Sequence, residues 1–395
     1  EAASVDVTDA VINEGGKFCA EVLAPLNQSG DQEGCTRHED GSVTTPKGFK
    51  EAFDQFREAG WGTLSQPEEF GGQGMPHVLG FAFEEFVSSA NQAFGMYPGL
   101  TNGAVSALLA KGSNEQQHRY IAKMVSGEWT GTMNLTEPHC GTDLGLMRTK
   151  AVPQEDGTYR ISGQKIFISA GEHDMAENIV HLVLAKIPGG PEGIKGVSLF
   201  VVETDKVEGF RRGRNLDKVG LKSNDTSELF FDDVRIPTAN MLGTEEGQGF
   251  AQLMTELPQE RLLIANQAIS MIERALAITI DYVKERKAFG KAVIEFQNTQ
   301  FKLAELKSEA TMARVFVNHC VGEHLKGQLS STTASMAKYL TTDLQCKVAD
   351  ECVQLHGGYG YMNEYPVARM FRDARVQRIY GGTNEIMKLL IARSL

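Results

Sequence analysis

The chain has 395 residues, of which 41% are hydrophobic, 23% charged and 8% aromatic. This length and composition predict two or three folded globular domains and exclude a disordered chain. The formal net charge of -12 repels polyanions, which argues against nucleic acid or an anionic membrane surface as the main partner.

Cysteine usage indicates an intracellular protein with reduced thiols. The chain has no C-x-x-C motif and no matching histidine pair, so neither a zinc site nor a disulfide framework is expected. No signal-peptide pattern opens the chain, and no apolar run of the ~18 residues that a membrane helix needs stands out, so we expect no integral membrane contact. The sequence begins at Glu1, which leaves a processed leader open. The six cysteines are Cys19, Cys35, Cys140, Cys320, Cys346 and Cys352.

Residues 1–127 follow a helical pattern with polar interruptions, and we expect an N-terminal α-helical domain there. The G-G-Q-G-M-P run at 71–76 is a loop by composition. Pro46 favours a helix start ahead of the apolar stripe that begins at Phe49.

In residues 128–242 the apolar period changes to two, which predicts strands. A hairpin turn is expected at 155–158. No helical crossover joins the predicted strands, so we expect a central antiparallel β-barrel or sandwich. The expected strands are 159–162, 165–169, 179–185, 197–202 and 229–234.

The helical period returns in residues 243–395, where apolar residues recur every three or four positions in three long stripes. With a short helix after Thr383, these stripes predict a C-terminal four-helix bundle and an α+β chain overall. Pro258 lies inside the first helix and is expected to bend it. The stripes cover 269–283, 303–321 and 340–355.

Two segments are candidates for one active site. The L-P-Q-E-R-L run at 257–262 places Glu260 early in a long amphipathic helix. The I-Y-G-G-T-N-E-I run at 379–386 is a glycine turn that leads into the last helix, where free N–H groups favour an oxyanion or a phosphate. A bundle would bring the two segments together. On pattern alone, however, Glu260 would be a surface charge.

The order of domains, and five motifs in order, resemble the acyl-CoA dehydrogenase family. Each motif is weak alone, but together they span nearly the whole chain, which makes the resemblance specific. The motifs are T-E-P-H-C-G-T-D at 136–143, G-Q-K-I-F-I-S at 163–169, E-R-K-A-F-G at 285–290, Q-L-H-G-G-Y-G at 354–360 and I-Y-G-G-T at 379–383.

The two parts of the chain resemble different branches of that family. Residues 1–202 resemble bacterial 3-methylthiopropionyl-CoA dehydrogenases through segments 99–104 and 170–174, and the remainder resembles long-chain acyl-CoA dehydrogenases through segments 224–231 and 257–265. We hypothesise a recombinant or intermediate lineage, which predicts a poorly filled boundary with cavities between sheet and bundle. Ala251 stands where the long-chain branch tends to carry a tyrosine, so acyl chain length, branching and thioether preference stay open.

The resemblance implies FAD-dependent oxidation of an acyl-CoA thioester to the trans-2-enoyl-CoA. Most family members place the catalytic base immediately before the Gly-Thr of the last motif, and here that position is Gly381. In the long-chain and isovaleryl branches the corresponding base is on the helix, which makes Glu260 the base here and Glu256 its rival. The backbone N–H of Gly381 would still serve the thioester oxygen.

Family members hold FAD with groups of one subunit and of its neighbour. For several positions the residues alone leave a simpler interpretation open: Thr136 and Thr142 can be turn residues, Phe167 can be sheet core, and Arg286 can belong to a solvated helix end. The implied contacts of the first group are Met133, Leu135, Thr136, Gly141, Thr142, Phe167, Ser169, Thr383 and Glu385, and those of the second are Arg286, Phe289, Gln297, Gln354, Gly357 and Gly358.

Substrate contacts also follow from the resemblance. Arg261 resembles a residue that contacts the CoA portion, Thr142 would border the substrate, and Tyr380 and Gly382 would line the thioester end of the acyl chain. The simpler alternative for Arg261 is an ion pair with a glutamate of its own helix.

The resemblance further implies an electron-transferring flavoprotein as electron acceptor and a homo-oligomer, with a tetramer favoured over a dimer. It implies a role in fatty acid β-oxidation, no metal, and a bacterial cytoplasmic location with the mitochondrial matrix as the alternative. Two other functions stay open: an acyl-CoA oxidase that uses O2 on the same fold, and a catalytically inactive relative that binds acyl-CoA or flavin.

Overall fold

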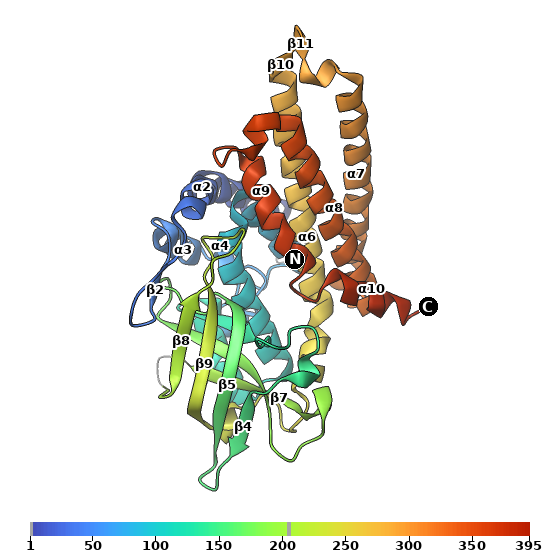
Figure 1. Cartoon of the computed structure of the whole chain (residues 1–395). Helices are drawn as coiled ribbons and strands as arrows, with labels where there is room; N and C mark the ends of the chain where they lie inside the picture. Colours follow the sequence, from blue (N-terminus) through green and yellow to red (C-terminus); the bar gives the residue numbers. More distant parts are fainter. Residues whose placement is uncertain (1–2, 204–206) are drawn as a thin grey trace.

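The computed structural model describes residues 3–203 and 207–395, apart from the side chains of Thr255 and Glu256. Helices form its N-terminal and C-terminal parts, and the β-sheet lies between them in the chain (Figure 1). The predicted α+β architecture, with helices, sheet and a C-terminal helical bundle in that order, is confirmed.

The N-terminal helices surround an aromatic core. Phe49, Phe53 and Phe56 are buried on one face of α3, as the apolar stripe predicts. The helix begins at Phe49 rather than at Pro46, because Gly48 precedes it in a left-handed conformation with φ of 90°. The helices are α1 (Val5–Phe18), the π-helical turn η1 (Cys19–Leu23), α2 (Ala24–Glu33), α3 (Phe49–Glu58), α4 (His77–Lys111) and α5 (Asn114–Val125), and a small hairpin joins β1 (Thr36–Arg37) to β2 (Val43–Thr44).

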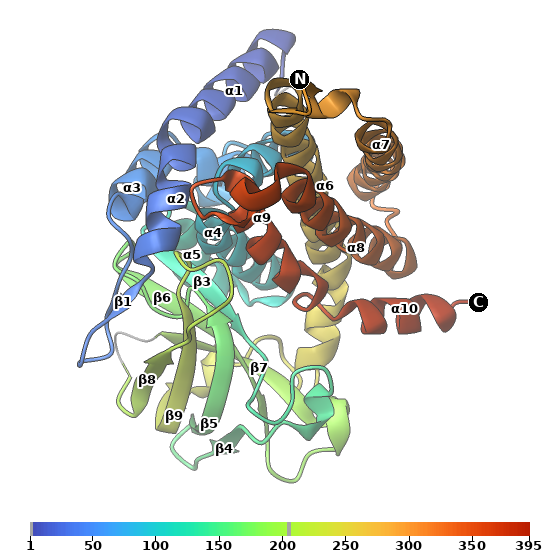
Figure 2. The same ribbon diagram turned by 45° about the horizontal axis from the view of Figure 1, so that its top comes forward.

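Helix α4 connects the three parts of the molecule, because it packs against α1, α6 and β3. It is interrupted at Asn91, whose φ of -158° and ψ of 86° are not helical. The side chain of Asn91 accepts a hydrogen bond from the backbone N–H of Phe94 at 3.1 Å and so caps the second half of the helix. Figure 2 shows α1–α3 on one side of α4 and α6, α8 and α9 on the other.

Seven of the described strands form one sheet. Strand β5 runs between β4 and β9 and carries register shifts on its β9 side. The two short strands expected at 159–162 and 165–169 are therefore one irregular strand. The strands are β3 (Trp129–Asn134), β4 (Lys150–Pro153), β5 (Thr158–Ser169), β6 (Asn178–Lys186), β7 (Val197–Glu203), β8 (Phe210–Asn215) and β9 (Thr226–Pro237).

Strand direction corrects one detail of the sequence prediction. Strand β9 pairs antiparallel with β5 and β8, as do β4 with β5 and β6 with β7, but β6 runs parallel to both β3 and β4. The residues 135–177, which include the β4–β5 hairpin, separate β3 from β6 and let both strands enter the sheet from the same end. An alternating pattern locates strands but does not give their direction.

The C-terminal part is a bundle with a hairpin at its far tip (Figure 1). The predicted stripes are largely buried, but Leu340 of the third stripe is 45% exposed. The elements are α6 (Gly249–Glu285), β10 (Lys287–Ala288), β11 (Lys291–Ala292), α7 (Gln297–Leu325), α8 (Ser331–His356), α9 (Pro366–Ala374) and α10 (Asn384–Ala392).

Helix α6 continues through Pro258 as a single helix. By length and composition alone, its segment Leu257–Glu285 could cross a membrane, which the sequence analysis did not single out. The most apolar window of this segment is 61% buried inside the fold, as in the core helix of a bundle.

The sheet is filled where the two resembling parts of the chain meet. Phe200 and Val202 of β7 and Leu229 and Phe231 of β9 are at most 1% exposed and belong to one apolar cluster. A cavity of about 320 Å³ lies elsewhere, between the N-terminal helices and the bundle. At the boundary between sheet and bundle, Leu199 and Val201 of β7 and Leu253 of α6 are buried in one apolar cluster, so the mixed-lineage hypothesis gains no support from the packing there.

Candidate active site

The bundle brings Glu260 and the glycine turn together around one face of α6. Glu260 is half-buried, and its Oε1 lies 3.7 Å from the position that a Cβ at Gly103 of α4 would occupy. A Cβ at Gly381 would overlap with Cδ1 of Ile264, which lies one helical turn after Glu260. The carboxylate thus points toward α4, and the turn closes the adjacent part of α6.

The geometry of the turn explains why its first glycine carries no side chain. Gly381 and Gly382 have φ angles of 64° and 88°, a left-handed region that other residues rarely adopt. A glutamate at position 381 would be strained in this conformation and would displace Ile264. A carboxylate from this turn is therefore disfavoured, whereas one from α6 already faces the same space.

A buried lysine that the sequence analysis missed supports this turn. Lys338 of α8 is fully buried, and its Nζ donates hydrogen bonds to the carbonyl oxygen of Gly382 at 2.8 Å and to Oδ1 of Asn384 at 2.9 Å. Burial, together with the nearby charge of Arg261, lowers the pKa of Lys338 to about 8. A lysine alone in the otherwise uncharged stretch 334–342 was the available signal. Thr383 caps α10 by accepting a hydrogen bond from the N–H of Ile386.

Arg261 lies inside the bundle, away from solvent. It is 2% exposed, and its guanidinium donates hydrogen bonds to the hydroxyl groups of Ser331 at 2.9 Å and Ser335 at 3.3 Å. Burial lowers its pKa, while the negative charge of Glu260 opposes that shift. These contacts hold Arg261 within the bundle, and both the CoA contact and the ion pair with a glutamate of its own helix stay predictions.

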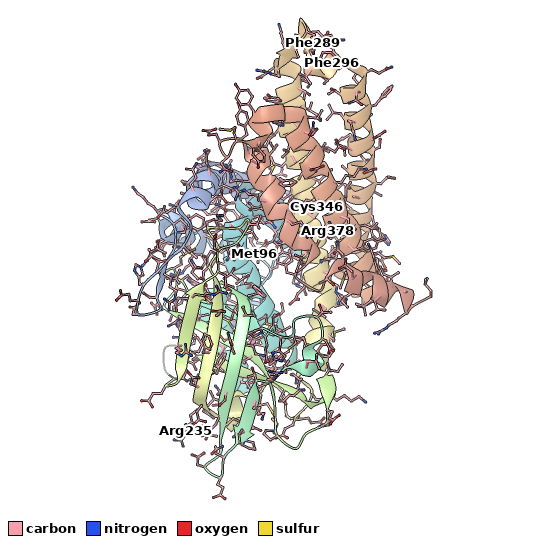
Figure 3. The ribbon with its side chains drawn as sticks, in the orientation of Figure 1. Met96, Arg235, Phe289, Phe296, Cys346 and Arg378 are labelled. Carbon is pink, nitrogen blue, oxygen red and sulfur yellow. The ribbon has the colours of Figure 1, made fainter. Side chains whose placement is uncertain are left out.

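Tyr380 connects the turn to α4. Its hydroxyl group accepts a hydrogen bond from Nε2 of Gln92 at 3.4 Å, and burial raises its pKa. Gln92 shares one face of α4 with Met96, Gly99 and Gly103, because these residues are three or four positions apart. Met96 lies on the side of α4 that faces the C-terminal helices (Figure 3).

The two glycines leave an open strip along this face of α4. A Cβ at Gly99 would have no atom within 4 Å, and one at Gly103 would meet only the carboxylate of Glu260. A glycine inside a helix costs about 1 kcal/mol relative to alanine. Since no neighbour of Gly99 requires its small size, we read the open strip as space for a ligand.

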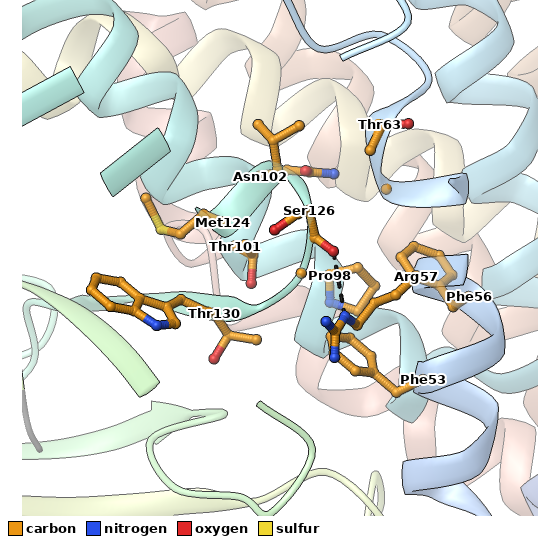
Figure 4. A pocket seen from close by; sticks show the side chains of 14 residues that line it. Phe53, Phe56, Arg57, Thr63, Pro98, Thr101, Asn102, Met124, Ser126 and Thr130 are labelled. Carbon is orange, nitrogen blue, oxygen red and sulfur yellow. Dashed lines mark hydrogen bonds between the residues drawn. The ribbon is translucent and has the colours of Figure 1, made fainter. Parts of the chain in front are cut away.

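A small cavity on another face of α4 is too small for the substrate (Figure 4). It has a volume of about 20 Å³ and is lined by Phe53, Pro98 and Thr101, among other residues. Nε of Arg57 donates a hydrogen bond to the carbonyl oxygen of Ser126 at its edge. This volume holds about one water molecule.

The loop after β3 is held by a buried ion pair. The carboxylate of Glu137 accepts hydrogen bonds from Nζ of Lys165 at 2.9 Å and from the backbone N–H groups of Arg148 and Thr149. Burial alone would raise the pKa of Glu137, but Lys165 and these hydrogen bonds hold it below its usual value. Lys165 also donates to the carbonyl oxygen of Leu135, so the loop is fixed at its start.

This fixed loop presents predicted flavin contacts at the surface. Gly141 and Thr142 are exposed, and Thr136 is half-buried beneath Gly141. The backbone N–H of Ile166 in β5 donates to the carbonyl oxygen of Thr136 at 3.0 Å and joins the loop to the sheet. Met133 is half-buried in β3.

A bulge in β5 places the side chain of Phe167 at the surface of the sheet. The register with β9 shifts between Lys165 and Ile168, and Phe167 has a φ of 61° and is 64% exposed. The alternative that Phe167 is sheet core is therefore wrong. An exposed aromatic ring on a strained bulge suits the cover of a flat ligand. Ser169, two residues on, pairs with Thr226 and is half-buried.

The second group of predicted cofactor contacts lies far from the first in a single chain. Phe289 is 97% exposed and has a φ of 53° at the tip of the bundle, away from the sheet (Figure 3). The guanidinium of Arg286 lies 5.6 Å from the ring of Tyr359. Gln297, Gln354, Gly357 and Gly358 are also exposed. Glu385 is exposed at the start of α10, beside the glycine turn.

Two further groups of polar side chains have local roles. His356 is buried and stacks on Tyr282 with ring centroids 4.1 Å apart, which makes it a polar residue of the core. The spacing of Glu137, His139 and Cys140 could hold a metal ion, since their ligand atoms lie within 4.8 Å of one another. A cation there would compete with the ammonium group of Lys165 for Glu137, so this donor set does not suit a metal.

The residues present fit a flavin in three respects. The bulge presents an exposed aromatic ring, the exposed glycine-containing loop allows close backbone approach, and Arg286 offers an exposed guanidinium that can bind phosphate. Within the described residues of one chain, however, the predicted flavin contacts at the sheet and those at the tip of the bundle lie apart.

Comparisons with known proteins identify the family to which the chain belongs. The N-terminal, middle and C-terminal domain models of acyl-CoA dehydrogenase match residues 9–128, 132–234 and 247–395. The chain is 39% identical to 3-methylmercaptopropionyl-CoA dehydrogenase of Ruegeria pomeroyi over 97% of its own length and 69% of that protein. It is 50% identical to the mitochondrial long-chain specific acyl-CoA dehydrogenase of Sus scrofa over 72% of its own length and 65% of that protein.

The fold comparison covers almost the entire chain. The crystal structure of an acyl-CoA dehydrogenase from Geobacillus kaustophilus matches with a TM-score of 0.89 at 36% identity, over 99% of this chain and 98% of that chain. The three domain models, which follow one another along the sequence, and this agreement of the folds lead to one conclusion. The chain belongs to the acyl-CoA dehydrogenase family.

Proposed function

We propose that this protein oxidises a saturated acyl-CoA thioester to the trans-2-enoyl-CoA, with Glu260 as the base that removes the α-proton. The observation that carries this proposal is the direction of the Glu260 carboxylate toward Gly103, across an open strip that the Gly381 turn borders. Bound FAD would supply the acceptor for the β-hydride.

Glu260 and Gly381 would act on different atoms of the thioester. The carboxylate accepts the α-proton, and the backbone N–H of Gly381 donates to the thioester oxygen, where negative charge develops as the proton leaves. The conformation of the turn fixes the direction of that N–H before the substrate binds. Lys338 keeps the turn in place through the carbonyl oxygen of Gly382.

The chain's own residues would hold FAD in two groups. Thr136, Thr142, Phe167 and Ser169 line the sheet side, where Phe167 would cover the flat ring system. Arg286 would pair with the pyrophosphate of an FAD bound to another copy, since a guanidinium binds phosphate oxygens in a bidentate manner. A homotetramer built from such pairs is the assembly that we propose, with a dimer as the smallest one that completes a site.

Exposed apolar side chains on the bundle support self-association. Phe301, Met312 and Val315 of α7 are 58%, 66% and 65% exposed, and their spacing of eleven and three residues places them on one face of the helix, where a second copy could cover them.

The open strip indicates where the acyl group would lie. From Gly103 to Gln92 the face of α4 extends about 16 Å, at 1.5 Å per residue. The thioester would lie beside Glu260, and the chain would run over Gly99 and Met96 toward the hydrogen bond between Gln92 and Tyr380. We therefore propose an extended medium or long acyl group as the substrate.

We propose an electron-transferring flavoprotein as the acceptor of the electrons, by analogy with the family. An oxidase would instead reduce O2, so sustained H2O2 production without an added acceptor would favour that alternative. A preparation that never takes up FAD would favour a catalytically inactive relative.

The deciding experiment is anaerobic reduction of the bound flavin by an acyl-CoA series from butanoyl-CoA to palmitoyl-CoA. Glu260→Gln should keep the yellow colour of the flavin and lower the rate of bleaching by several powers of ten, because it removes the base while keeping its size. Glu256→Gln, at the rival position, should bleach within a few-fold of the wild-type rate. An undiminished rate in Glu260→Gln would show that the base is elsewhere.

A further inference from the structure

The cavity of about 320 Å³ lies behind the candidate active site, between η1, α4, α6 and α9. Its volume falls in the range of small-molecule pockets, about 300 to 1,000 Å³. Apolar side chains form much of its wall, including Phe86, Ala90, Met271, Ile278 and Met370. Such a wall suits an aliphatic chain.

Two arginines in this wall distinguish the cavity from a packing defect. Arg369 is 7% exposed, and one of its terminal nitrogens donates to the carbonyl oxygen of Asn363 at 3.1 Å. Its Nε is buried and has no hydrogen-bond partner among the described residues. Arg274 lines the same cavity and is exposed. A buried guanidinium N–H without an acceptor is unfavourable, and a carboxylate oxygen would satisfy it.

The acidic residue in the wall is already engaged. Oδ1 of Asp373 accepts a hydrogen bond from the backbone N–H of Leu221 at 2.7 Å. Burial raises the pKa of Asp373 to about 6. The neighbouring Arg372 forms a bidentate pair with Asp31. Burial lowers the pKa of Arg369, while the charges of Asp31 and Asp373 oppose that shift and favour its protonated form. The cavity thus retains Arg369 and Arg274 as the cationic groups that can bind an anion.

The cavity also borders the acyl strip. Gln92 lines the cavity and donates the hydrogen bond to Tyr380, whose backbone leads directly into Gly381. The Gln92–Tyr380 pair thus forms a boundary between the catalytic space and the cavity. A ligand in the cavity would contact this boundary.

We propose that the cavity binds an aliphatic carboxylate, with its chain among Met271, Met370 and Phe86 and its carboxylate at Arg369 and Arg274. The carboxylate has two sources: a free fatty acid, or the far end of an ω-carboxyacyl-CoA that passes the Gln92–Tyr380 boundary. The second source rests on the proposed function, whereas the first does not require turnover.

The first test is a calorimetric titration of the purified, FAD-loaded protein with decanoate. Saturable binding is expected, and Arg274→Gln should weaken it about tenfold, the worth of one charged hydrogen bond. Ala90→Leu, which fills the cavity, should abolish it. Arg235→Gln is the matched control, because this exposed arginine lies at the far end of the sheet (Figure 3) and should leave binding unchanged. Equal binding of decanoate by all four proteins would overturn the proposal. The absence of decanoate binding to wild type would also overturn it, unless the second test assigns the carboxylate to the substrate.

The second test distinguishes the two sources. Wild type and Arg274→Gln would be compared with hexadecanoyl-CoA and its ω-carboxy analogue, with anaerobic flavin reduction as the readout. A rise in the half-saturating concentration of about tenfold for the analogue alone would assign the carboxylate to the substrate. No difference between the thioesters, together with decanoate binding that depends on Arg274, would assign it to a free fatty acid. If neither effect is observed, the proposal is overturned. The proposed function would still stand in that case, provided that bleaching depends on Glu260.

Discussion

The ammonium group of Lys338 lies 2.8 Å from the carbonyl oxygen of Gly382, so a buried cation on α8 holds the turn that precedes α10. The turn contains two consecutive glycines in left-handed conformations and has little rigidity of its own. Its shape, and with it the direction of the Gly381 N–H, therefore depends on a side chain more than forty positions earlier in the sequence.

Replacement of Lys338 by methionine should slow catalysis without a matching loss of substrate affinity. The lost hydrogen bond to a charged group is worth about 1.5–3 kcal/mol, which corresponds to a decrease in kcat of about 10- to 100-fold if the turn is needed only as the reaction proceeds. Steady-state kinetics with KM and kcat resolved would measure it. Lys347→Met on the same helix removes an exposed lysine paired with Glu309 and should be nearly neutral. Equal effects of both substitutions would contradict a positioning role for Lys338.

Substitution of Gly99 by leucine should shorten the acyl group that the enzyme accepts. The new side chain would enter the open strip on α4, so the rate with palmitoyl-CoA should fall by about tenfold or more while that with butanoyl-CoA changes little. The free energy of unfolding should rise by up to about 1 kcal/mol, because leucine favours a helix more than glycine does. Rates for a series of acyl-CoA substrates and urea denaturation give both quantities. A uniform loss for all chain lengths would show that the acyl group does not pass Gly99.

Mixing two defective variants should restore activity if each flavin site is completed by another copy. Phe167→Ala should weaken FAD binding from the sheet side, and Arg286→Ala should weaken it from the bundle tip, so each alone should retain less flavin than wild type. After unfolding and refolding together, mixed oligomers contain sites with both residues intact. Activity above that of either variant refolded alone, with flavin content measured by absorbance, would confirm shared sites. Val152→Ala on the same sheet is the control for Phe167 and should retain its flavin.

The stability of the sheet should fall on the acid side because of two buried histidines. His173 bonds to Thr130, and His181 bonds to Thr132. Burial lowers the pKa of His173 to about 4 and that of His181 to about 3, from 6.5 for both. Below pH 6.5 the unfolded chain binds protons that the folded chain does not, so the free energy of unfolding decreases as the pH falls. The stabilisation that the two neutral histidines contribute is fully present above pH 6.5.

Each of these histidines contributes up to about 1.4 kcal/mol per pH unit to the slope of the free energy of unfolding against pH. Replacement of His181 by asparagine should remove one such slope, which urea denaturation between pH 4 and 6.5 would detect. Val152→Ala on the same sheet provides the control, because it changes no titratable group and should leave the wild-type slope unchanged. A His181→Asn curve parallel to that of wild type would contradict the prediction.

Local patterns predicted the elements well and their spatial relations poorly. The buried face of α3 follows from the spacing of Phe49, Phe53 and Phe56, since a helix places such residues on one side. The parallel pairing of β3 with β6 does not follow, because alternation is the same in either direction. The start of α3 was misplaced at Pro46, since the left-handed conformation of Gly48 became evident only in the structure.

The candidate site was predictable only where one segment carries the signal. Glu260, Gly381 and Phe167 stand in motifs that can be read along the chain, and the structure supplies their exposure and direction. The contacts of Lys338 with Gly382 and of Gln92 with Tyr380 join residues 44 and 288 positions apart. Such contacts depend on how the helices pack, which no local pattern encodes.

The position of Phe289, 97% exposed on the hairpin tip, has a consequence for handling the protein. If this tip completes the flavin site of another copy, cofactor retention is governed by mass action between subunits as well as by affinity within one subunit. Dilution would then release the yellow cofactor together with the partner chain, and thermal stability would increase with protein concentration.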